Sequence, residues 1–268
     1  MPEGHTIHRL ARDLKRSLGG APVAASSPQG RFADSASLLD GQRIARTEAW
    51  GKDLFVHWEG SEILHVHLGL IGKFRPSPAP GPPARDTIRL RLEGGASEGA
   101  TDVWDLTGPM TCRLITPKER REVTARLGAD PLRRSPDVNA ARTRFLATRR
   151  GVAAALLDQR IIAGIGNVYR AELLFRAGIH PEVPANELSE DDFDSLWADT
   201  VDLLRIGVRY GAIITTEPAE IGRSLGRMRS DDRLYVYKQQ RCRRCGTDIA
   251  IADVAGRNCY FCPTCQPR

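Results

Sequence analysis

Apolar residues near the start of the chain recur every three or four positions, which places them on one face of a helix. They are Ile7, Leu10, Ala11, Leu14 and Leu18. The pattern predicts a helix that begins near Thr6 and ends at Gly19-Gly20, because paired glycines favour a helix stop. The N-terminus of this helix is expected just after Pro2 and Glu3.

Between about residues 43 and 116 the apolar positions change to a period of two, which is the spacing of β-strands. From 88 to 92, isoleucine and leucine alternate with arginine. Two further apolar runs, 54–58 and 63–68, flank Glu59-Gly60 and predict a β-hairpin. We therefore expect one helix followed by a β-sandwich or barrel in about the first 120 residues.

Residues 119–212 return to helical spacing, so a domain boundary is expected within 117–136. Ser189 is followed by three acidic residues, which predicts a capped helix start. The face behind this cap consists of Phe193, Leu196, Trp197, Thr200, Val201 and Leu204. Residues 76–85 contain five prolines and residues 213–233 are polar with several glycines and arginines, so both are expected to be loops, the second of them mobile.

The composition is typical of a soluble globular protein, with 268 residues, 41% of them hydrophobic and 27% charged. No run of eighteen consecutive apolar residues predicts a membrane span, and the N-terminus lacks the apolar core of a secretory signal. We therefore expect a cytoplasmic protein without a membrane partner.

The net charge of +6 is unevenly distributed. Residues 205–268 contain twelve Lys and Arg against six Asp and Glu, whereas the rest of the chain carries 27 of each. The whole excess lies in the last quarter of the chain, which indicates a local surface for a polyanion. A role in solubility alone explains the same excess equally well.

Four of the six cysteines form the pattern C-x2-C-x16-C-x2-C, namely Cys242, Cys245, Cys262 and Cys265. Two such pairs without an export signal indicate a tetrahedral four-thiolate zinc site on a β-hairpin, whereas a redox C-x-x-C would not need two copies. Because protein ligands would fill all four positions, the single zinc ion is expected to be structural. Cys259 leaves one alternative, since it lies three residues before Cys262 and could replace Cys265. Cys112 is expected to be a buried apolar residue.

A second candidate binding element is Gly164-Ile165-Gly166-Asn167, a tight turn leading into a helix that would stop at Gly178. We expect Asn167 to cap this helix, whose first backbone N–H groups suit a phosphate. A dinucleotide-binding glycine motif does not fit, because Tyr169 occupies the third glycine position and no suitable strand precedes the turn. A helix cap without a ligand is the plain alternative.

Arg257 lies in an expected hairpin turn, Gly256-Arg257-Asn258. An arginine at a rigid turn can direct two hydrogen bonds onto one phosphate. A solvated arginine without a ligand is the alternative.

The start of the chain offers an amine nucleophile. After removal of Met1, Pro2 would carry a free secondary amine, which forms with an aldehyde an iminium ion that is cationic at every pH. The adjacent Glu3 could donate or shuttle a proton. Lys52, in Trp50-Gly51-Lys52, is expected at a strand start and would add positive charge to the same site. A Met-Pro start without chemical purpose and a solvated lysine are the alternatives.

His65 and His67 lie two positions apart and therefore share one face of an expected strand. Two such imidazoles can hold a metal ion, but no carboxylate is spaced in the sequence to complete a site. We expect packing or hydrogen bonding for both side chains.

The order of these motifs along the chain resembles one known family. The segments that carry the resemblance are MPEGHTIHRLARDL, WGKDLF, HLGLIGKFR, DQRIIAGIGNVYRAELLFRAGIHP, CRRCG and GRNCYFCPTCQ. They are similar to the formamidopyrimidine-DNA glycosylase / endonuclease VIII family over almost the whole chain, and the opening MPEG resembles the endonuclease VIII branch. The resemblance implies base-excision repair, in which an oxidised base is removed and the abasic site is cut by β,δ-elimination.

The resemblance implies catalytic roles for four residues. Pro2 matches the Schiff-base nucleophile that attacks the sugar C1′, and Glu3 matches the catalytic acid. Lys52 matches a lysine that donates protons and contacts a phosphate. Arg257 matches the zinc-finger arginine that holds phosphates around the lesion and assists δ-elimination.

The resemblance also implies DNA contacts. Residues 158–178 match the family's helix–two-turn–helix motif, with Asn167 in the phosphate-binding position. Leu70 lies where the family inserts an apolar residue into the gap left by the extruded base. His5 and Thr6 replace a second Pro-Glu pair found in many members, so a role for that second carboxylate is not implied here.

Pattern and resemblance together predict an α+β protein in four segments. Residues 1–118 would form a catalytic β-sandwich with its N-terminal helix, 119–136 a linker, 137–234 a helical helix–two-turn–helix domain, and 235–268 a β-hairpin zinc finger. The expected protein is a monomeric, bacterial-type, nucleoid-associated enzyme that acts on damaged DNA.

The expected function is that of a bifunctional DNA glycosylase and abasic-site lyase that removes oxidised bases, pyrimidines foremost. The alternative is a non-catalytic zinc-finger nucleic-acid-binding protein, which would need the cysteines and the basic C-terminus but nothing from Pro2, Glu3 or Lys52. A tautomerase with an N-terminal proline explains neither the cysteine pattern nor the charge distribution.

Overall fold

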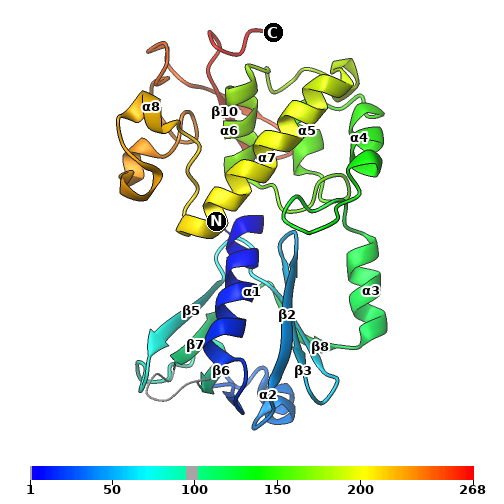
Figure 1. Cartoon of the computed structure of the whole chain (residues 1–268), viewed down its shortest axis with the longest axis vertical. Helices are drawn as coiled ribbons and strands as arrows, with labels where there is room; N and C mark the ends of the chain where they lie inside the picture. The colour runs from blue at the N-terminus through cyan, green and yellow to red at the C-terminus, as the bar shows by residue number, and fades with distance from the viewer. Residues whose placement is uncertain (1, 95–101) are drawn as a thin grey trace. The chain divides into compact units, whose positions relative to one another are not determined.

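The computed structural model describes residues 2–94 and 102–268 (Figure 1). Helix α1 spans Gly4–Leu18 and begins two residues earlier than predicted, because apolar spacing does not register its first residues, Gly4 and His5, although both are buried. Glu3 precedes the helix with an extended backbone, and its carbonyl oxygen accepts the N–H of Thr6 at 2.9 Å. The helix ends at Gly19, as the glycine pair predicted.

Among the described residues, two antiparallel four-stranded sheets form the first unit together with α1, α2 (Ala33–Leu39) and α3 (Pro117–Ala125). One sheet has the strand order β1-β6-β7-β5 and the other the order β2-β3-β4-β8. The strands are β1 (Ala24–Ser26), β2 (Ile44–Trp50), β3 (Asp53–Trp58), β4 (Ile63–His67), β5 (Lys73–Pro78), β6 (Ile88–Gly94), β7 (Asp102–Thr107) and β8 (Thr111–Ile115). The buried faces of both sheets and of α1 share one hydrophobic core, which gives the expected sandwich.

The hairpin predicted around Glu59-Gly60 is present, because β3 and β4 pair with Phe55 opposite His65. A second hairpin joins β2 and β3 through the two-residue turn Gly51-Lys52. Gly51 has φ of 58°, a conformation that glycine adopts without a Cβ penalty. Lys52 therefore lies in a tight turn, one residue before the strand at whose start it was predicted.

The proline-rich segment is more regular at its start than the sequence predicted. β5 continues through Pro76 and Pro78, which pair opposite Trp104 and Asp102 of β7. β5 is an edge strand, and a proline without an N–H group is tolerated where no further strand needs that donor. Residues 79–85 form the predicted loop.

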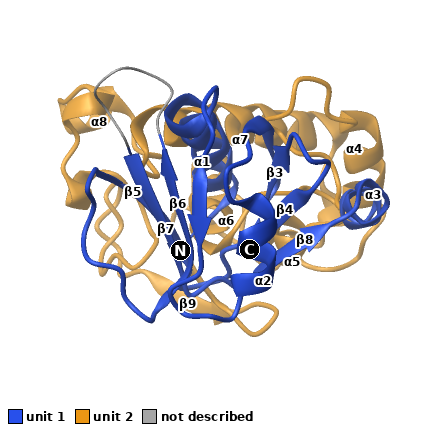
Figure 2. Ribbon diagram, turned by 90° about the horizontal axis from the view of Figure 1, so that it is seen from below, with its two compact units in different colours: residues 1–126 blue, residues 127–268 orange. Residues whose placement is uncertain are grey.

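Residues 119–136, expected to be a linker, begin inside α3 and continue into an irregular segment. Thr116 caps α3, and Pro117 is the first residue of the helix. The chain divides into two compact units between Arg126 and Leu127, coloured separately in Figure 2.

The second unit is mainly helical. Its longest helix, α7 (Glu190–Tyr210), starts at the predicted cap, because Ser189 Oγ accepts the N–H of Asp192 at 3.1 Å and the Asp192 carboxylate accepts the N–H of Ser189 at 2.9 Å. The other helices are α4 (Val138–Leu146), α5 (Val152–Leu157), α6 (Asn167–Ala177), α8 (Pro218–Ile221) and the 3₁₀ turns η1 (Ala185–Glu187), η2 (Leu225–Arg227) and η3 (Ser230–Asp232). A hairpin of β9 (Ala250–Asp253) and β10 (Asn258–Phe261) follows.

Residues 213–233 are not the irregular loop that the sequence predicted. They contain α8, η2 and η3, and the side chains of Ile214, Thr215 and Met228 are buried. One-turn helices leave no periodic pattern, so they could not be predicted from the sequence. The expected α+β class, with a helix-plus-sandwich unit and a helical unit carrying a β-hairpin, is confirmed. Within the described residues, no helix combines the length and the apolar character that crossing a bilayer requires.

Candidate functional site

Glu3 and Pro2 lie at the N-terminal end of α1. The Glu3 residue is fully buried and Pro2 is half-buried. The Glu3 N–H donates to Thr6 Oγ1 at 3.5 Å, so the first turn of the helix fixes its backbone. A carboxylate in this position is stabilised by the positive end of the helix dipole. The arrangement places an acid next in sequence to the predicted nucleophile and restricts its movement.

His5 is buried in the same first turn, with Nε2 3.2 Å from Thr6 Oγ1. Burial lowers the pKa of His5 to about 4, so the imidazole is neutral at pH 7. His5 therefore adds no charge next to Glu3 under physiological conditions. The burial of His5 could not be predicted from the pattern of apolar residues in the sequence.

Lys52 lies next to a polar group that sequence spacing did not reveal. His65 Nε2 is 2.7 Å from the Asp53 carboxylate, and the His65 ring stacks on Phe55 with centroids 5.0 Å apart. His67 Nδ1 accepts the N–H of Gly69 at 3.1 Å. The prediction for both histidines was packing or hydrogen bonding, and the structure shows a hydrogen bond at each ring. Asp53 was missed because cross-strand register, not sequence distance, brings it to His65.

The charges and burial around His67 favour its neutral form. Burial lowers the pKa of His67, the Asp53 carboxylate opposes that shift, and the positive charge of Lys52 adds to it. A neutral imidazole beside a lysine avoids placing two cations together. The end of the sheet next to the Gly51-Lys52 turn thus combines a lysine, a carboxylate and two histidines.

Leu70, the predicted wedge, is 61% exposed in the turn that follows β4. Ile71 beside it is 79% exposed, and Met110 in the turn before β8 is 71% exposed. Met110 reaches this turn because its N–H donates to the His67 carbonyl at 2.9 Å, and a Cβ added to Gly69 would lie 3.0 Å from Met110 Cβ. Large apolar side chains that are exposed to water at two neighbouring turns are suited to insert into another surface.

Asn167 is not the cap of α6, as was predicted, but its first residue; Gly166 holds the cap position. The Asn167 side chain is engaged elsewhere, because its Nδ2 donates to the Asn258 carbonyl of the hairpin at 2.9 Å. Its Oδ1 accepts a short hydrogen bond from Arg170. The contact with a segment 91 residues away could not be read from the local sequence.

Arg170 is fully buried and connects α6 to the turn of the β9–β10 hairpin. Its guanidinium donates to the carbonyl oxygens of Val254 at 3.3 Å, Asn258 at 3.1 Å and Arg257 at 3.5 Å. These bonds, with the one to Asn167, give the buried cation several acceptors. Asn167 and Arg257, predicted separately as phosphate ligands, are therefore joined through one side chain.

Arg257 is exposed at the hairpin turn. The turn runs from Val254 to Arg257, and its central residues Ala255 and Gly256 have φ of 56° and 71°, as a type I′ turn requires. The prediction, Gly256-Arg257-Asn258, placed the turn too far along the chain and did not include Ala255. The guanidinium of Arg257 thus projects from a short, well-defined turn.

Glu172, a further residue of α6, is fully buried and was not singled out from the sequence. Its carboxylate accepts the N–H groups of Tyr235, Val236 and Tyr237 at 2.7 to 2.9 Å and the hydroxyl of Thr215 at 2.5 Å. Glu172 therefore fixes the chain segment that leads into the cysteine region.

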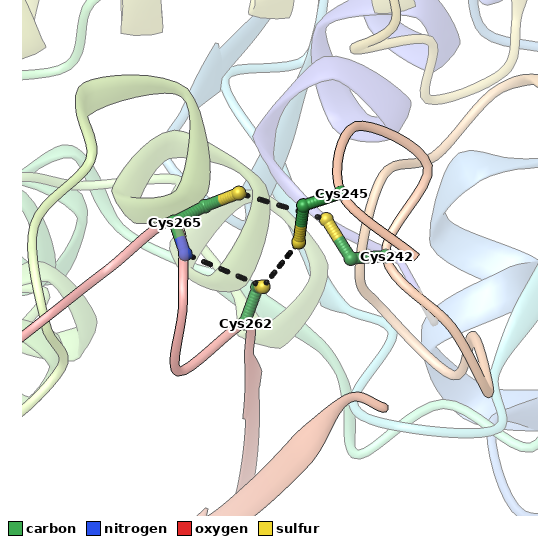
Figure 3. A group of neighbouring side chains, drawn as sticks. All are labelled: Cys242, Cys245, Cys262 and Cys265. Carbon is green, nitrogen blue, oxygen red and sulfur yellow. Dashed lines mark hydrogen bonds between the residues drawn. The ribbon is translucent and has the colours of Figure 1, made fainter. Parts of the chain in front are cut away.

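The four predicted ligands Cys242, Cys245, Cys262 and Cys265 converge on one point (Figure 3). All their Sγ atoms lie within 4.8 Å of one another, with Cys245 and Cys262 at 3.4 Å and Cys242 and Cys265 at 3.8 Å. Tetrahedral zinc with bonds of about 2.3 Å needs sulfur atoms about 3.8 Å apart. The donor set and its spacing fit one metal ion.

Cys259 is excluded from this cluster, which resolves the alternative that the sequence left open. It is fully buried in the hydrophobic core of the second unit, together with residues of α5 and α6. Its neighbour Tyr260 points to the other face of β10, as strand alternation requires. Cys112 is half-buried and packs against the core of the first unit.

Two domain models and several full-length relatives match this chain. Sequence models of the formamidopyrimidine-DNA glycosylase N-terminal domain and of the formamidopyrimidine-DNA glycosylase H2TH domain match residues 1–106 and 127–219. Endonuclease 8 1 of Mycobacterium tuberculosis is 46% identical over 272 residues, covering 99% of this chain and 100% of the relative. The formamidopyrimidine-DNA glycosylase of Thermomicrobium roseum is 31% identical, covering 100% and 99%.

Solved structures give the same result for the fold. The Lactococcus lactis formamidopyrimidine-DNA glycosylase in complex with N7-benzyl-Fapy-dG DNA has a TM-score of 0.77 at 24% identity and covers both chains completely. The same enzyme bound non-covalently to DNA containing an AP site has a TM-score of 0.75 at 25% identity, covering 99% of this chain and 100% of that one.

Proposed function

Because the chain belongs to the formamidopyrimidine-DNA glycosylase / endonuclease VIII family, we propose that it is a bifunctional DNA glycosylase and abasic-site lyase. The observation that carries the proposal is the buried Glu3 at the start of α1, directly after Pro2. The first turn of α1 holds this residue in place, because the Glu3 N–H donates to Thr6 Oγ1. A held acid beside a secondary amine is the pair that imine chemistry on a sugar requires.

The proposed reaction starts when the Pro2 nitrogen donates its lone pair to C1′ of the damaged nucleoside. The C1′–N bond to the base breaks, and the base leaves with the bonding electrons and takes up the proton that the Pro2 nitrogen releases. Glu3 donates a proton to the ring oxygen O4′, so that the C1′–O4′ bond opens and a cationic iminium forms. Before this, the nucleotide must leave the base stack, and Leu70 would fill the gap.

The iminium is the electron sink for strand cleavage. Loss of a C2′ proton expels the 3′ phosphate in β-elimination, and a second elimination expels the 5′ phosphate. Water then hydrolyses the imine and frees Pro2. Lys52 would donate a proton and contact a phosphate near the lesion, while Asn167 and Arg257 would hold the backbone phosphates and Arg257 would assist the second elimination.

We assign one structural zinc ion to Cys242, Cys245, Cys262 and Cys265, because thiolates in this number and spacing favour zinc. When bound, the zinc would rigidify the two knuckles that follow the Glu172-held segment. Oxidised pyrimidines are the proposed substrates, which the MPEG opening and the 46% identity to a protein named endonuclease 8 support. A cytoplasmic monomer completes the proposal.

Borohydride trapping tests the central step. Wild-type protein with duplex DNA containing thymine glycol or an abasic site should give a covalent adduct after reduction, and P2G should give none. E3Q should slow base release by roughly 10²- to 10⁴-fold. Mass spectrometry of the intact wild-type protein should give the mass expected for the chain without Met1.

A second outcome distinguishes the rival function. Wild-type protein that binds abasic DNA but never forms a reducible adduct would refute the lyase and favour a non-catalytic zinc-finger binder. Retention of Met1 in active preparations would exclude Pro2 as the nucleophile.

A further inference from the structure

A pocket of about 310 Å³ in the second unit carries three arginines from two separate segments. Arg150 precedes α5, Arg160 follows it, and Arg257 comes from the hairpin turn. Among the described residues that line the pocket, Asp158 is the one acid, so the lining keeps an excess of two positive charges. The remaining lining is mostly small or aliphatic, for example Ala154.

Asp158 orients the two arginines of the α5 side. Its carboxylate accepts Arg150 Nη2 at 2.8 Å, Arg160 Nη2 at 3.0 Å and Arg160 Nε at 3.1 Å. It also accepts the backbone N–H of Arg160 at 3.0 Å, which fixes the turn itself. The hydrogen bonds from Arg160 hold the pKa of Asp158 well below its usual range, so the carboxylate stays ionised. The side chain of Asp158 is only 10% exposed.

The adjacent Gln159 stabilises the same turn from inside. Its Oε1 accepts the N–H of Gly164 at 2.9 Å, and its Nε2 donates to the Ile165 carbonyl at 2.9 Å. The turn that carries Arg160 is thereby joined to the turn that leads into Asn167. The arginines themselves stay accessible, with 49% of the Arg150 side chain and 76% of the Arg160 side chain exposed.

We propose that this pocket binds one phosphodiester group of the DNA backbone, with Arg150 and Arg160 as donors beside Arg257. Guanidinium groups held in a fixed orientation suit the planar, two-point recognition of phosphate. An open, charged pocket suits a DNA backbone that runs across it better than it suits a small molecule, which binds in an enclosed cavity. The inference rests on the proposed function, since it requires a DNA substrate. It extends the contact surface from the hairpin to the segments on either side of α5.

The salt dependence of binding tests this assignment. The probe is a duplex with a tetrahydrofuran abasic-site analogue, bound to the full-length, metal-loaded protein. Each lost phosphate contact should make the slope of log K against log salt shallower by about 1. R160A and R150A should weaken binding roughly 3- to 10-fold at physiological salt and reduce the slope, whereas R160K should retain most of the slope but lose affinity.

R149A is the matched control, because Arg149 is the exposed sequence neighbour of Arg150 and does not line the pocket. It removes the same charge and should change affinity less than about 2-fold. Equal slopes for R149A and R160A, with normal wild-type binding and trapping, would overturn the pocket alone. A wild-type protein that binds no duplex would instead overturn the proposed function, and the pocket with it.

Discussion

Glu48 on β2 is a carboxylate whose ionisation is set by its neighbours. It accepts Arg120 Nε and Nη2 at 2.7 Å each and lies 3.1 Å from His57 Nε2. Burial by itself would raise the pKa of Glu48, but the hydrogen bond from His57 and the charges of Arg120 and Arg46 bring it to about 2. The residue therefore links α3 to the sheet through a charge that persists in mild acid.

Glu48→Gln should destabilise the protein in a pH-dependent way. The folded-state pKa lies below the unfolded-state value of about 4.5, so the stabilisation is complete above that pH and is lost as the pH falls towards 2. We expect the free energy of unfolding to drop by about 2 kcal/mol at pH 7 and the gap to wild type to narrow below pH 4.5. Urea titrations over this range measure it. Glu59→Gln in the exposed β3–β4 turn is the control, and a gap that stays constant down to pH 3 would contradict the argument.

At this scale the sequence was informative only where the partner is near in the chain. The Ser189 cap could be predicted because the N–H group that Ser189 Oγ accepts belongs to Asp192, three residues away. From the sequence alone, Asp53, Arg170 and Glu172 cannot be distinguished from ordinary charged surface residues. The N–H groups that donate to the Glu172 carboxylate come 63 to 65 residues later in the chain, so only the fold could reveal that Glu172 is buried.

Helix α6 is connected to several other parts of its unit. Arg170 at its first turn holds the hairpin turn, Glu172 holds the segment 235–237, and its Gly178 stop has the φ of 69° that a glycine C-cap requires. The glycine turn and the helix were predictable from pattern. The hydrogen bond from Asn167 to the hairpin could not be predicted, because an asparagine suits a helix cap and such a contact equally well.

Two cysteine variants should separate the metal site from the core. C262S removes a proposed zinc ligand, so bound zinc should fall from one ion per chain to near none and the melting temperature of the second unit should drop by about 10 °C or more. C259S, a substitution only a few residues earlier in the chain, should keep the zinc because Cys259 lies in the core. Metal analysis and thermal melts provide the readout. Full zinc occupancy in C262S would refute the ligand assignment.

The whole molecule consists of two units with separate hydrophobic cores. The change of periodicity predicted that the chain would divide within 117–136, and the division of the structure at 126 falls in that range. The sequence could not place it more closely, because α3 has helical spacing yet packs on β4 and β8 of the first unit.

Calorimetry should resolve two unfolding transitions. Chelation of the metal should lower the second unit's transition alone, since all four thiolates belong to residues 127–268. Leu14→Ala and Leu174→Ala, which truncate fully buried side chains in the two cores, should each cost about 2–5 kcal/mol in a different transition. If both variants shift one common transition equally, the units do not unfold independently.

The two prolines of β5 have a consequence for the behaviour of the protein in concentrated solution. An exposed sheet edge can recruit a strand from another molecule and so begin aggregation. Pro76 and Pro78 carry no N–H, which leaves that edge without two of the donors a foreign strand would need. The same residues that interrupt the β-pattern in the sequence thus help to keep copies of the protein apart.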